Sequence, residues 1–427
     1  MDNSNKITFQ KHQKKFRGKP VVRMHVMVKP IGPVCNLNCE YCYYLSKQEL
    51  LETDNKWRIS DETLEEYIKQ YIEGQNHKEI VFSWQGGEPT LLGVGFFRKV
   101  VELEKKYAPP YVRIENDLQT NGTLIDDEWC RFLKEENFLV GLSIDGPREL
   151  HDFYRVGNNN EGSFDRVINA VRLLKKHGVR FATLSCVNRK TSEHPVEVYR
   201  FLRDVIGSNQ MQFIPIVEPK DYFTTAPHYW KSENMPVIGT SAARPGNPDS
   251  VVHDWNVDPD QYGEFLIKVF DEWYKNDVGV INVPFFDSAV VQWAGKPSPL
   301  CIFAPMCGKG LAMEHDGNVY ACDHYVYPEY RRGNIKEIDI TEMAFSKKQE
   351  AFGYAKDSML PNKCRQCKFL FACSGECPKN RFIRTEEGEP GLNYLCAGLY
   401  KYFEHIHPFI KKINRKIGYP IADDVPD

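Results

Sequence analysis

The sequence contains no long uninterrupted hydrophobic run. A membrane-spanning helix needs roughly 18 apolar residues in a row, and no stretch of this 427-residue chain approaches that length. The opening segment MDNSNKITFQKHQKKFRGKP also lacks the apolar core of a secretory signal, and we expect it to form a solvated tail. These absences predict a cytoplasmic protein that does not bind a membrane.

The chain also has no large excess of charge of either sign. Its 55 Lys and Arg residues nearly balance its 58 Asp and Glu residues, which gives a net charge of −3. Nucleic acids and anionic membrane surfaces attract proteins with a clear excess of positive charge. We therefore expect no nucleic-acid partner.

Cysteine, by contrast, is abundant, and its distribution is uneven. Disulfides are rare in a reducing compartment, so the 13 cysteines need another explanation. Three lie within residues 35–42 and eight lie between residues 301 and 396. Only Cys130 and Cys186 stand alone, and we expect both to be inert core residues. The clustering of the others predicts metal binding.

Short β-rich runs alternate with helix-like segments over the first half of the chain. Segments 60–74 and 163–178 are helix-like, and we expect Ser60 and Ser163 to cap them. Successive βα units predict a parallel sheet, which right-handed crossovers curve into a barrel or part of one. The six predicted strands are Arg23–Lys29, Glu79–Gln85, Val112–Thr120, Leu139–Ile144, Val179–Val187 and Met211–Val217.

The alternation ends after the sixth predicted strand. Residues 233–257 are rich in Pro, Gly, Ser and Asn, and we expect a surface insertion there. A helix is expected over 258–275, and a β-hairpin that turns at Asp316 and Gly317 over 310–325. We therefore expect a tail over residues 1–20, a barrel domain over 21–278 and a cysteine-rich domain over 279–427.

The first cysteine group, Cys35, Cys39 and Cys42, follows the first predicted strand. Three thiolates can bind three irons of a [4Fe–4S] cluster, which leaves the fourth iron without a protein ligand. An open coordination position is what a catalytic metal centre needs. A zinc site completed by a distant ligand is the alternative, although the three residues after Cys42 cannot supply that ligand.

The CxxxCxYC spacing resembles the signature of the radical S-adenosylmethionine (SAM) superfamily, and Gly86-Gly87-Glu88-Pro89 resembles its GGEP segment. The resemblance implies an α/β fold with a partial (β/α)6 barrel, and a cluster whose open iron is chelated by SAM. An arginine would suit the SAM carboxylate; the alternatives are that Ser143 is only a strand-end residue and Arg155 only a surface cation. The implied cofactor contacts are Tyr41, Gln85, Gly86, Gly87, Glu88, Ser143, Arg155 and Ile216.

The second cysteine group contains enough thiolates for two [4Fe–4S] clusters or for two structural zinc sites. The spacing from Cys364 to Cys377 resembles the pattern of SPASM domains, which bind auxiliary iron–sulfur clusters. The resemblance implies three [4Fe–4S] clusters in all. It assigns one auxiliary cluster to Cys301, Cys307, Cys322 and Cys377, and the other to Cys364, Cys367, Cys373 and Cys396.

Within the SPASM proteins, the chain is similar to anaerobic sulfatase-maturating enzymes in MHVMVKPIGPVCNLNCEYCYYL, WQGGEPTLLG, QTNGTL, LSIDGP and CGKG. The resemblance covers roughly residues 21–410. It implies that a 5′-deoxyadenosyl radical takes a hydrogen from Cβ of a sulfatase cysteine or serine, which becomes Cα-formylglycine without oxygen. The implied partners are an unfolded or nascent Cys/Ser-x-Pro/Ala-x-Arg segment and an electron donor such as flavodoxin or ferredoxin.

The resemblance also implies that Asp323, next to Cys322, is the catalytic base. A carboxylate beside a cluster can accept a proton while the electron passes to iron. The alternatives are that Asp323 is a turn residue and that His324 is the base. Four aromatic residues are candidates either for lining a substrate channel or for ordinary core positions, and the core suits Phe213 better; they are Tyr43, Tyr44, Trp84 and Phe213.

Two other functions remain open at this point. Another SPASM peptide maturase, which forms a thioether or a cross-link, would bind the same clusters; the short segment before the barrel leaves no room for the leader-binding domain that many of them carry. A non-catalytic iron–sulfur carrier or zinc scaffold would need neither an open iron nor a GGEP segment.

Overall fold

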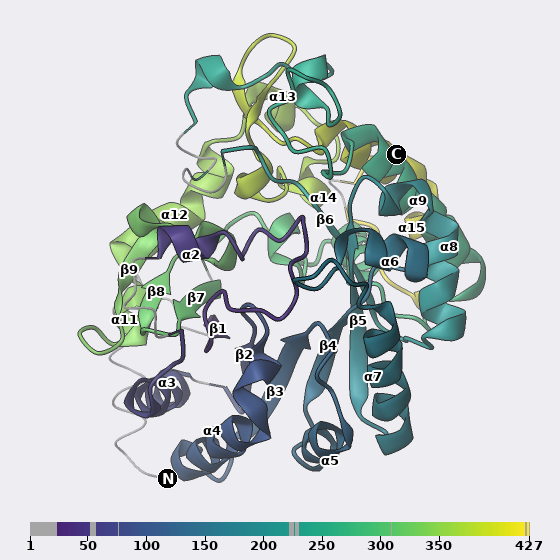
Figure 1. Cartoon of the computed structure of the whole chain (residues 1–427). Coiled ribbons are helices and arrows are strands. Elements are labelled where there is room, and N and C mark those ends of the chain that lie inside the picture. Colours follow the sequence, from purple (N-terminus) through teal and green to yellow (C-terminus); the bar gives the residue numbers. More distant parts are fainter. Residues whose placement is uncertain are drawn as a thin grey trace.

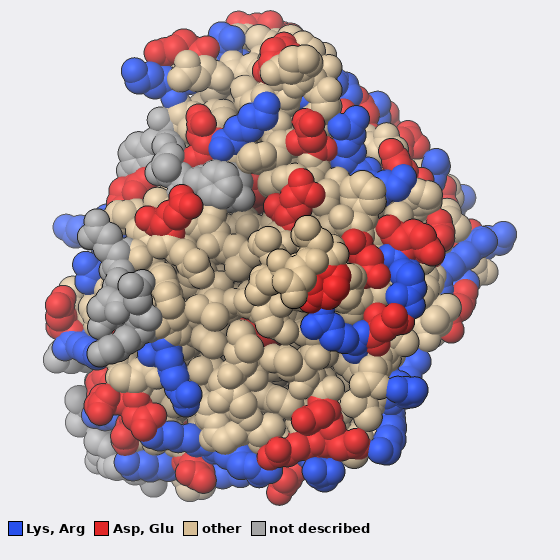
Figure 2. Space-filling model, viewed as in Figure 1, with Lys and Arg blue, Asp and Glu red and all other residues tan. Residues whose placement is uncertain are grey.

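The computed structural model describes residues 24–51, 57–75, 77–221, 226, 230–308, 310–422 and 425–426. The predicted tail over residues 1–20 lies outside this part of the chain. No helix within it has the length and apolar character needed to cross a membrane. On the face shown in Figure 2, charges of both signs intermingle around the edge, and uncharged residues dominate the centre.

Six parallel strands form the curved sheet that the sequence predicts (Figure 1). Their neighbour order, β6-β5-β4-β3-β2-β1, follows the chain, as in a barrel built from successive βα units. This arrangement confirms the partial (β/α)6 barrel. The strands are β1 His25–Lys29, β2 Glu79–Trp84, β3 Arg113–Thr120, β4 Leu139–Ser143, β5 Arg180–Val187 and β6 Met211–Pro215.

Helices lie along the outside of this sheet (Figure 1). Ser60 caps its helix as predicted, because its hydroxyl accepts a hydrogen bond from Thr63 N at 3.2 Å. Ser163 does not cap; its hydroxyl donates instead to Arg155 O at 2.7 Å. The helices are α2 Lys47–Leu50, α3 Asp61–Glu73, α4 Gly93–Tyr107, α5 Asp127–Glu135, α6 Arg148–Tyr154, α7 Phe164–His177, α8 Pro195–Arg200, α9 Pro259–Asn276 and α10 Pro284–Trp293.

The C-terminal part extends the barrel sheet. Strand β7 pairs parallel with β1, and β8 and β9 follow antiparallel, so the sheet has nine strands. The predicted hairpin turns at Asp316 and Gly317, where Gly317 has φ +87°. These strands are β7 Gly310–Glu314, β8 Asn318–Tyr320, β9 Arg331–Asn334, β10 Ile383–Arg384 and β11 Pro390–Leu392, and the helices are α11 Ile340–Ala344, α12 Lys347–Ser358, α13 Asn362–Arg365, α14 Leu370–Cys373 and α15 Cys396–Ile417.

Segment 233–257 is only partly the surface insertion that its composition predicts. Its beginning is largely exposed, but its end is buried, with Asn256 and Val257 fully inaccessible. Main-chain bonds cause this burial: Arg189 N donates to Trp255 O at 3.0 Å, and Val257 N donates to Ile216 O at 3.1 Å. The segment therefore returns to the carboxyl ends of β5 and β6.

Candidate active site

Cys35, Cys39 and Cys42 lie in the loop that leaves β1, at the carboxyl edge of the sheet. The three thiols are close enough to interact electrostatically, and burial raises the pKa of Cys35 to about 12 and also raises those of Cys39 and Cys42. Such thiols stay neutral unless a metal replaces their protons. The grouping and the chemistry of these donors therefore fit three irons of a [4Fe–4S] cluster.

The glycines of GGEP bring the β2 loop directly against this cysteine loop. A Cβ atom on Gly87 would lie 2.0 Å from the carbonyl oxygen of Val34, so only glycine fits there. Gly87 N donates to Gly32 O at 2.8 Å. Gly86 has φ +132°, a conformation that other residues rarely adopt. The two loops thus share one rigid backbone arrangement.

Glu88 is buried, and protein donors surround its carboxylate. Thr120 Oγ1 and Asn121 N each donate to it at 2.7 Å, and Thr90 N donates at 3.0 Å. These bonds join the β2 loop to the end of β3. The contacts indicate that the Glu88 side chain holds the loop in place, while its predicted contact with the cofactor stays a prediction.

Two of the predicted SAM contacts, Tyr41 and Arg155, meet at Asp145, a residue that the sequence analysis did not select. Arg155 Nε donates to Asp145 Oδ2 at 2.9 Å, and the Tyr41 hydroxyl donates to the same oxygen. The Arg155 guanidinium also lies 5.6 Å from the centroid of the Tyr41 ring. Ile216 packs in the same cluster as Tyr41. The available signal was that Asp145 is the aspartate of LSIDG, the segment that contains Ser143.

Ser143 and Gln85 lie at the carboxyl ends of β4 and β2, two strands of the same sheet. Ser143 ends β4, and its Oγ accepts a hydrogen bond from Gln119 Nε2 at 3.0 Å. Gln85 follows β2, and its backbone N–H donates to Val28 O at 2.8 Å. Both positions lie at the carboxyl edge of the sheet, the edge at which the cysteine loop leaves β1.

The cluster around Tyr41 and Ile216 contains two residues that the sequence reasoning missed. Trp255, from the end of segment 233–257, packs there together with Cys186. Cys186 is buried in this cluster on β5, which fits the predicted core position, and its thiol also accepts a hydrogen bond from Arg155 Nη2 at 3.5 Å. Cys130 lies in the main core, as predicted. A tryptophan within a polar, proline-rich segment was the only signal for Trp255.

Asp323 lies opposite the cysteine loop, directly after Cys322. Lys29 Nζ, at the end of β1, is 2.6 Å from Oδ1, and the Tyr43 hydroxyl donates to Oδ2 at 2.7 Å. Burial alone would raise the pKa of Asp323, but the Lys29 ammonium and the hydrogen bonds from Lys29 and Tyr43 together outweigh burial, and the pKa falls to about 2. The side chain is 17% exposed. Asp323 is therefore an ionised carboxylate with room for a further hydrogen-bond donor.

His324, the other candidate base, has different surroundings. Its Nδ1 lies 3.6 Å from the thiol of Cys377. Burial lowers the pKa of His324 to about 4, so the ring is neutral at physiological pH. Its position against a cysteine of the C-terminal group fits packing beside a cluster.

The four aromatic candidates for a substrate channel fall into two groups. Tyr43 and Tyr44 are next to the Asp323 region, and the Tyr44 hydroxyl donates to Glu314 at 2.5 Å. Trp84 is fully buried in the barrel core, where its indole N–H donates to Asn116 at 2.7 Å, so of its two predicted positions the core is the correct one. Phe213 packs on Phe265 in the same core, which confirms the core alternative.

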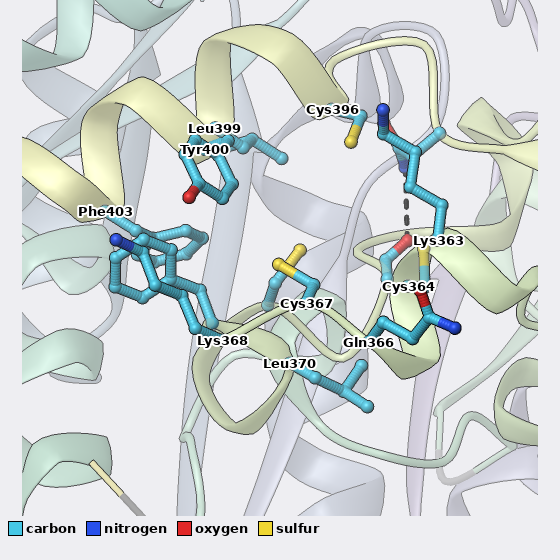
Figure 3. A pocket seen from close by; sticks show the side chains of 14 residues that line it. Lys363, Cys364, Gln366, Cys367, Lys368, Leu370, Cys396, Leu399, Tyr400 and Phe403 are labelled. Atoms are coloured by element: carbon cyan, nitrogen blue, oxygen red, sulfur yellow. Dashed lines mark hydrogen bonds between the residues drawn. The ribbon is translucent and has the colours of Figure 1, made fainter. Parts of the chain in front are cut away.

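The eight C-terminal cysteines gather in two sets of four. Electrostatic neighbours of the Cys377 thiol are Cys307, Cys322 and Cys301. Those of the Cys373 thiol include Cys396, Cys364 and Cys367. The second set lines a cavity of about 310 Å³ between α14 and the start of α15, where the labelled sulfurs face one another (Figure 3). Both sets have the ligand chemistry of a [4Fe–4S] cluster.

No group of three or more His, Cys, Asp or Glu side chains in the described part of the chain is arranged to hold a single metal ion. Thiolates around a cubane lie farther apart than those around one ion, because each binds a different iron.

Comparison with known families first defines the class of protein. Residues 30–202 match the model of the radical SAM superfamily, and residues 301–368 match the SPASM iron–sulfur cluster-binding domain. The chain is thus a radical SAM enzyme that binds SAM, a [4Fe–4S] cluster and auxiliary clusters.

The chain belongs to the family of anaerobic sulfatase-maturating enzymes. It is 44% identical over 394 residues to the serine-type enzyme of Bacteroides thetaiotaomicron, with 92% of each chain covered. It is 31% identical to a cysteine-type enzyme of Clostridium perfringens, with 92% of this chain and 99% of that one covered. The solved structure of native anSMEcpe with bound AdoMet and Cp18Cys peptide superposes with a TM-score of 0.77 at 31% identity, over 92% of this chain and 99% of that chain. This membership favours sulfatase maturation over the peptide-maturase, carrier and zinc-scaffold alternatives.

Proposed function

We propose that the protein converts a serine, in preference to a cysteine, of its sulfatase substrate to Cα-formylglycine without oxygen. The oxidation of a cysteine or serine is the reaction of the family. Two comparisons support serine: identity is 44% to a serine-type enzyme but 31% to a cysteine-type enzyme. The observation that carries the proposal is Asp323, held between Lys29 and Tyr43 beside Cys322.

Cys35, Cys39 and Cys42 would hold a [4Fe–4S] cluster at the end of β1, and SAM bound to that cluster would supply the 5′-deoxyadenosyl radical needed to remove a hydrogen atom from Cβ of the substrate. The pairing of Tyr41 and Arg155 with Asp145 keeps both side chains in fixed orientations at this edge, which supports their predicted role in binding SAM.

Asp323 takes the proton of the substrate hydroxyl. A carboxylate with a low pKa is a weak base toward an ordinary alcohol, but the hydroxyl becomes far more acidic as the carbon is oxidised. Cys322, the preceding residue, belongs to the set with Cys301, Cys307 and Cys377, whose cluster accepts the electron. The proton would therefore leave the substrate oxygen to Asp323, and the electron would leave the adjoining carbon radical to the cluster of Cys322, the neighbouring residue of the chain.

The substrate segment is proposed to bind while unfolded or nascent, in the cytoplasm, with a flavodoxin or ferredoxin as reductant. A cluster that must be reduced before SAM is cleaved favours such a low-potential donor and a reducing compartment.

The test is anaerobic incubation of iron-loaded protein with SAM, dithionite and two matched peptides, Ser-x-Pro-x-Arg and Cys-x-Pro-x-Arg. We expect the serine peptide to lose the mass of two hydrogen atoms and to react faster than the cysteine peptide. Faster conversion of the cysteine peptide would overturn the serine assignment. Formation of 5′-deoxyadenosine with neither peptide changed would reject the sulfatase substrate but keep the enzyme class.

A further inference from the structure

The ring of Tyr43 is held by packing from three directions. It meets the ring of His324 edge-on, with centroids 5.9 Å apart, and the ring of Tyr44 at 6.1 Å. The ammonium of Lys379 lies 5.8 Å from the Tyr43 centroid, a cation–π distance. Lys379 is itself fixed by Glu218 and by a bond to Val217 O at 2.8 Å. The cysteine loop, the C-terminal part and the end of the barrel thus all fix the direction of the phenol.

That phenol bonds only one oxygen of Asp323. Tyr43 OH donates to Oδ2 at 2.7 Å, while Lys29 approaches Oδ1 at 2.6 Å. The two contacts fix the plane of the carboxylate. An ionised carboxylate has about four lone-pair positions, so Asp323 still has capacity to accept a bond from a substrate hydroxyl.

We infer that Tyr43 is a positioning residue that aligns Asp323 with a serine hydroxyl and thereby biases the enzyme toward serine substrates. The inference rests on the proposed function. In the step concerned, the substrate carbon has already lost a hydrogen atom; its O–H bond breaks, an O–H bond to Asp323 forms, one electron passes to an auxiliary iron–sulfur cluster, and a C=O bond results.

The two substrate types need this alignment to different degrees. A cysteine thiol ionises near pH 8.5, so its proton leaves readily even when the base is poorly placed. A serine hydroxyl is a much weaker acid and gives up its proton only to a base already in hydrogen-bond contact. Loss of the Tyr43 hydroxyl should therefore affect serine oxidation more than cysteine oxidation.

The discriminating variant is Tyr43→Phe, which removes one oxygen and keeps the ring contacts. The matched control is Tyr199→Phe, because the buried Tyr199 hydroxyl also donates to an aspartate, Asp277, at 2.8 Å, on α8 away from the site. Formylglycine and 5′-deoxyadenosine are quantified together with the matched serine and cysteine peptides.

We expect Tyr43→Phe to lower kcat for the serine peptide about tenfold, since one hydrogen bond to a charged group is removed. With the cysteine peptide we expect less than about a threefold loss, with KM for both peptides changing by less than about threefold. Formation of 5′-deoxyadenosine should continue, so its ratio to formylglycine rises. Tyr199→Phe should match the wild type in the ratio of 5′-deoxyadenosine to formylglycine and in the preference for the serine peptide.

An unchanged serine-to-cysteine ratio in Tyr43→Phe would overturn the inference. If the wild type converts neither peptide, the proposed function fails instead, and the two failures are thereby distinguished. If Tyr43→Phe does not load iron, Lys379→Met serves as the second variant, since it removes the charge over the Tyr43 ring. It should lower the serine preference about threefold, and an unchanged preference would overturn the inference.

Discussion

Lys29 and Tyr43 approach the two oxygens of Asp323 from the end of β1 and from the loop after it. At this scale, the residue type at 323 could be predicted from its position after a cysteine, through resemblance. Its two partners could not, because Lys29 and Tyr43 lie almost 300 positions earlier and only the folded sheet brings them together. The importance of Asp145 was likewise not predictable, because it depends on the bonds from Tyr41 and Arg155 that the fold creates.

Asp323→Asn tests the base directly. The amide keeps the size of the side chain but cannot accept the proton, so formylglycine formation should fall at least roughly 100-fold. Formation of 5′-deoxyadenosine should be largely retained. Asp165→Asn, which alters an exposed partner of Arg148, is the control and should leave both products unchanged. Unaltered formylglycine formation in Asp323→Asn would show that another group takes the proton.

Lys47 presents a different residue-scale case. Its ammonium is buried, lies 3.5 Å from the centroid of the Tyr327 ring and has no hydrogen-bond partner among the described residues. Burial lowers the pKa of Lys47 from 10.5 to about 7. The charged form is thus penalised in the folded state: the penalty is complete below pH 7 and disappears as the pH rises from about 7 to 10.5.

Lys47→Met should accordingly stabilise the protein at low pH. We expect a gain of roughly 2 kcal/mol in the free energy of unfolding at about pH 6, and a smaller gain at about pH 9. Thermal or denaturant unfolding of the wild type and of Lys47→Met at the two pH values measures this gain. A gain that is larger at the higher pH would contradict the assigned direction.

At the scale of elements, hydrophobic periodicity located the strands to within two residues of their observed ends. The failures have local causes. Ser163 bonds Arg155 O and not its own helix. The exposure of segment 233–257 was predicted from its composition, and composition does not reveal that main-chain hydrogen bonds bury the end of the segment.

The packing of the β2 loop on the cysteine loop gives an element-scale prediction. Gly87→Ala must displace the Val34 carbonyl, so it should lower the free energy of unfolding by about 1–3 kcal/mol and reduce the iron bound by the first cluster. Gly95→Ala, in α4, is the matched control, because no described atom lies within 4 Å of its added Cβ. It should be neutral or stabilising by up to about 1 kcal/mol. Iron analysis and thermal unfolding measure both, and equal iron content in the two variants would refute the close-packing argument.

At the scale of the whole molecule, two sets of cysteines tie together segments that are distant in the chain. The set around Cys373 joins α14 to the start of α15, and the set around Cys377 joins the loop near Cys301 to the end of the hairpin. The nine-stranded sheet could not be predicted from sequence, because the pairing of β7 with β1 is a contact between residues far apart in the chain.

Removal of iron should therefore destabilise the C-terminal cysteine-rich part more than the barrel. We expect amides between residues 301 and 396 to exchange at least about tenfold faster after anaerobic chelation, while those of α4 and α5 change little. Hydrogen-exchange mass spectrometry of the iron-loaded and chelated protein measures the difference. Equal change in both parts would show that the clusters do not hold the C-terminal region.

The pairing of β7 with β1 also has a consequence for the order in which the enzyme is made on the ribosome. The strand that leads into the cysteine loop emerges early, yet its second neighbour is synthesised only after the whole barrel has been completed. In the proposed reaction, a chain that ends before Asp323 has the thiols for the first cluster but lacks the acceptor for the proton, and the set of cysteines for the electron acceptor is complete only at Cys377. Productive turnover would therefore begin only after translation has passed Cys377, so the order of the chain delays radical chemistry until both acceptors are present.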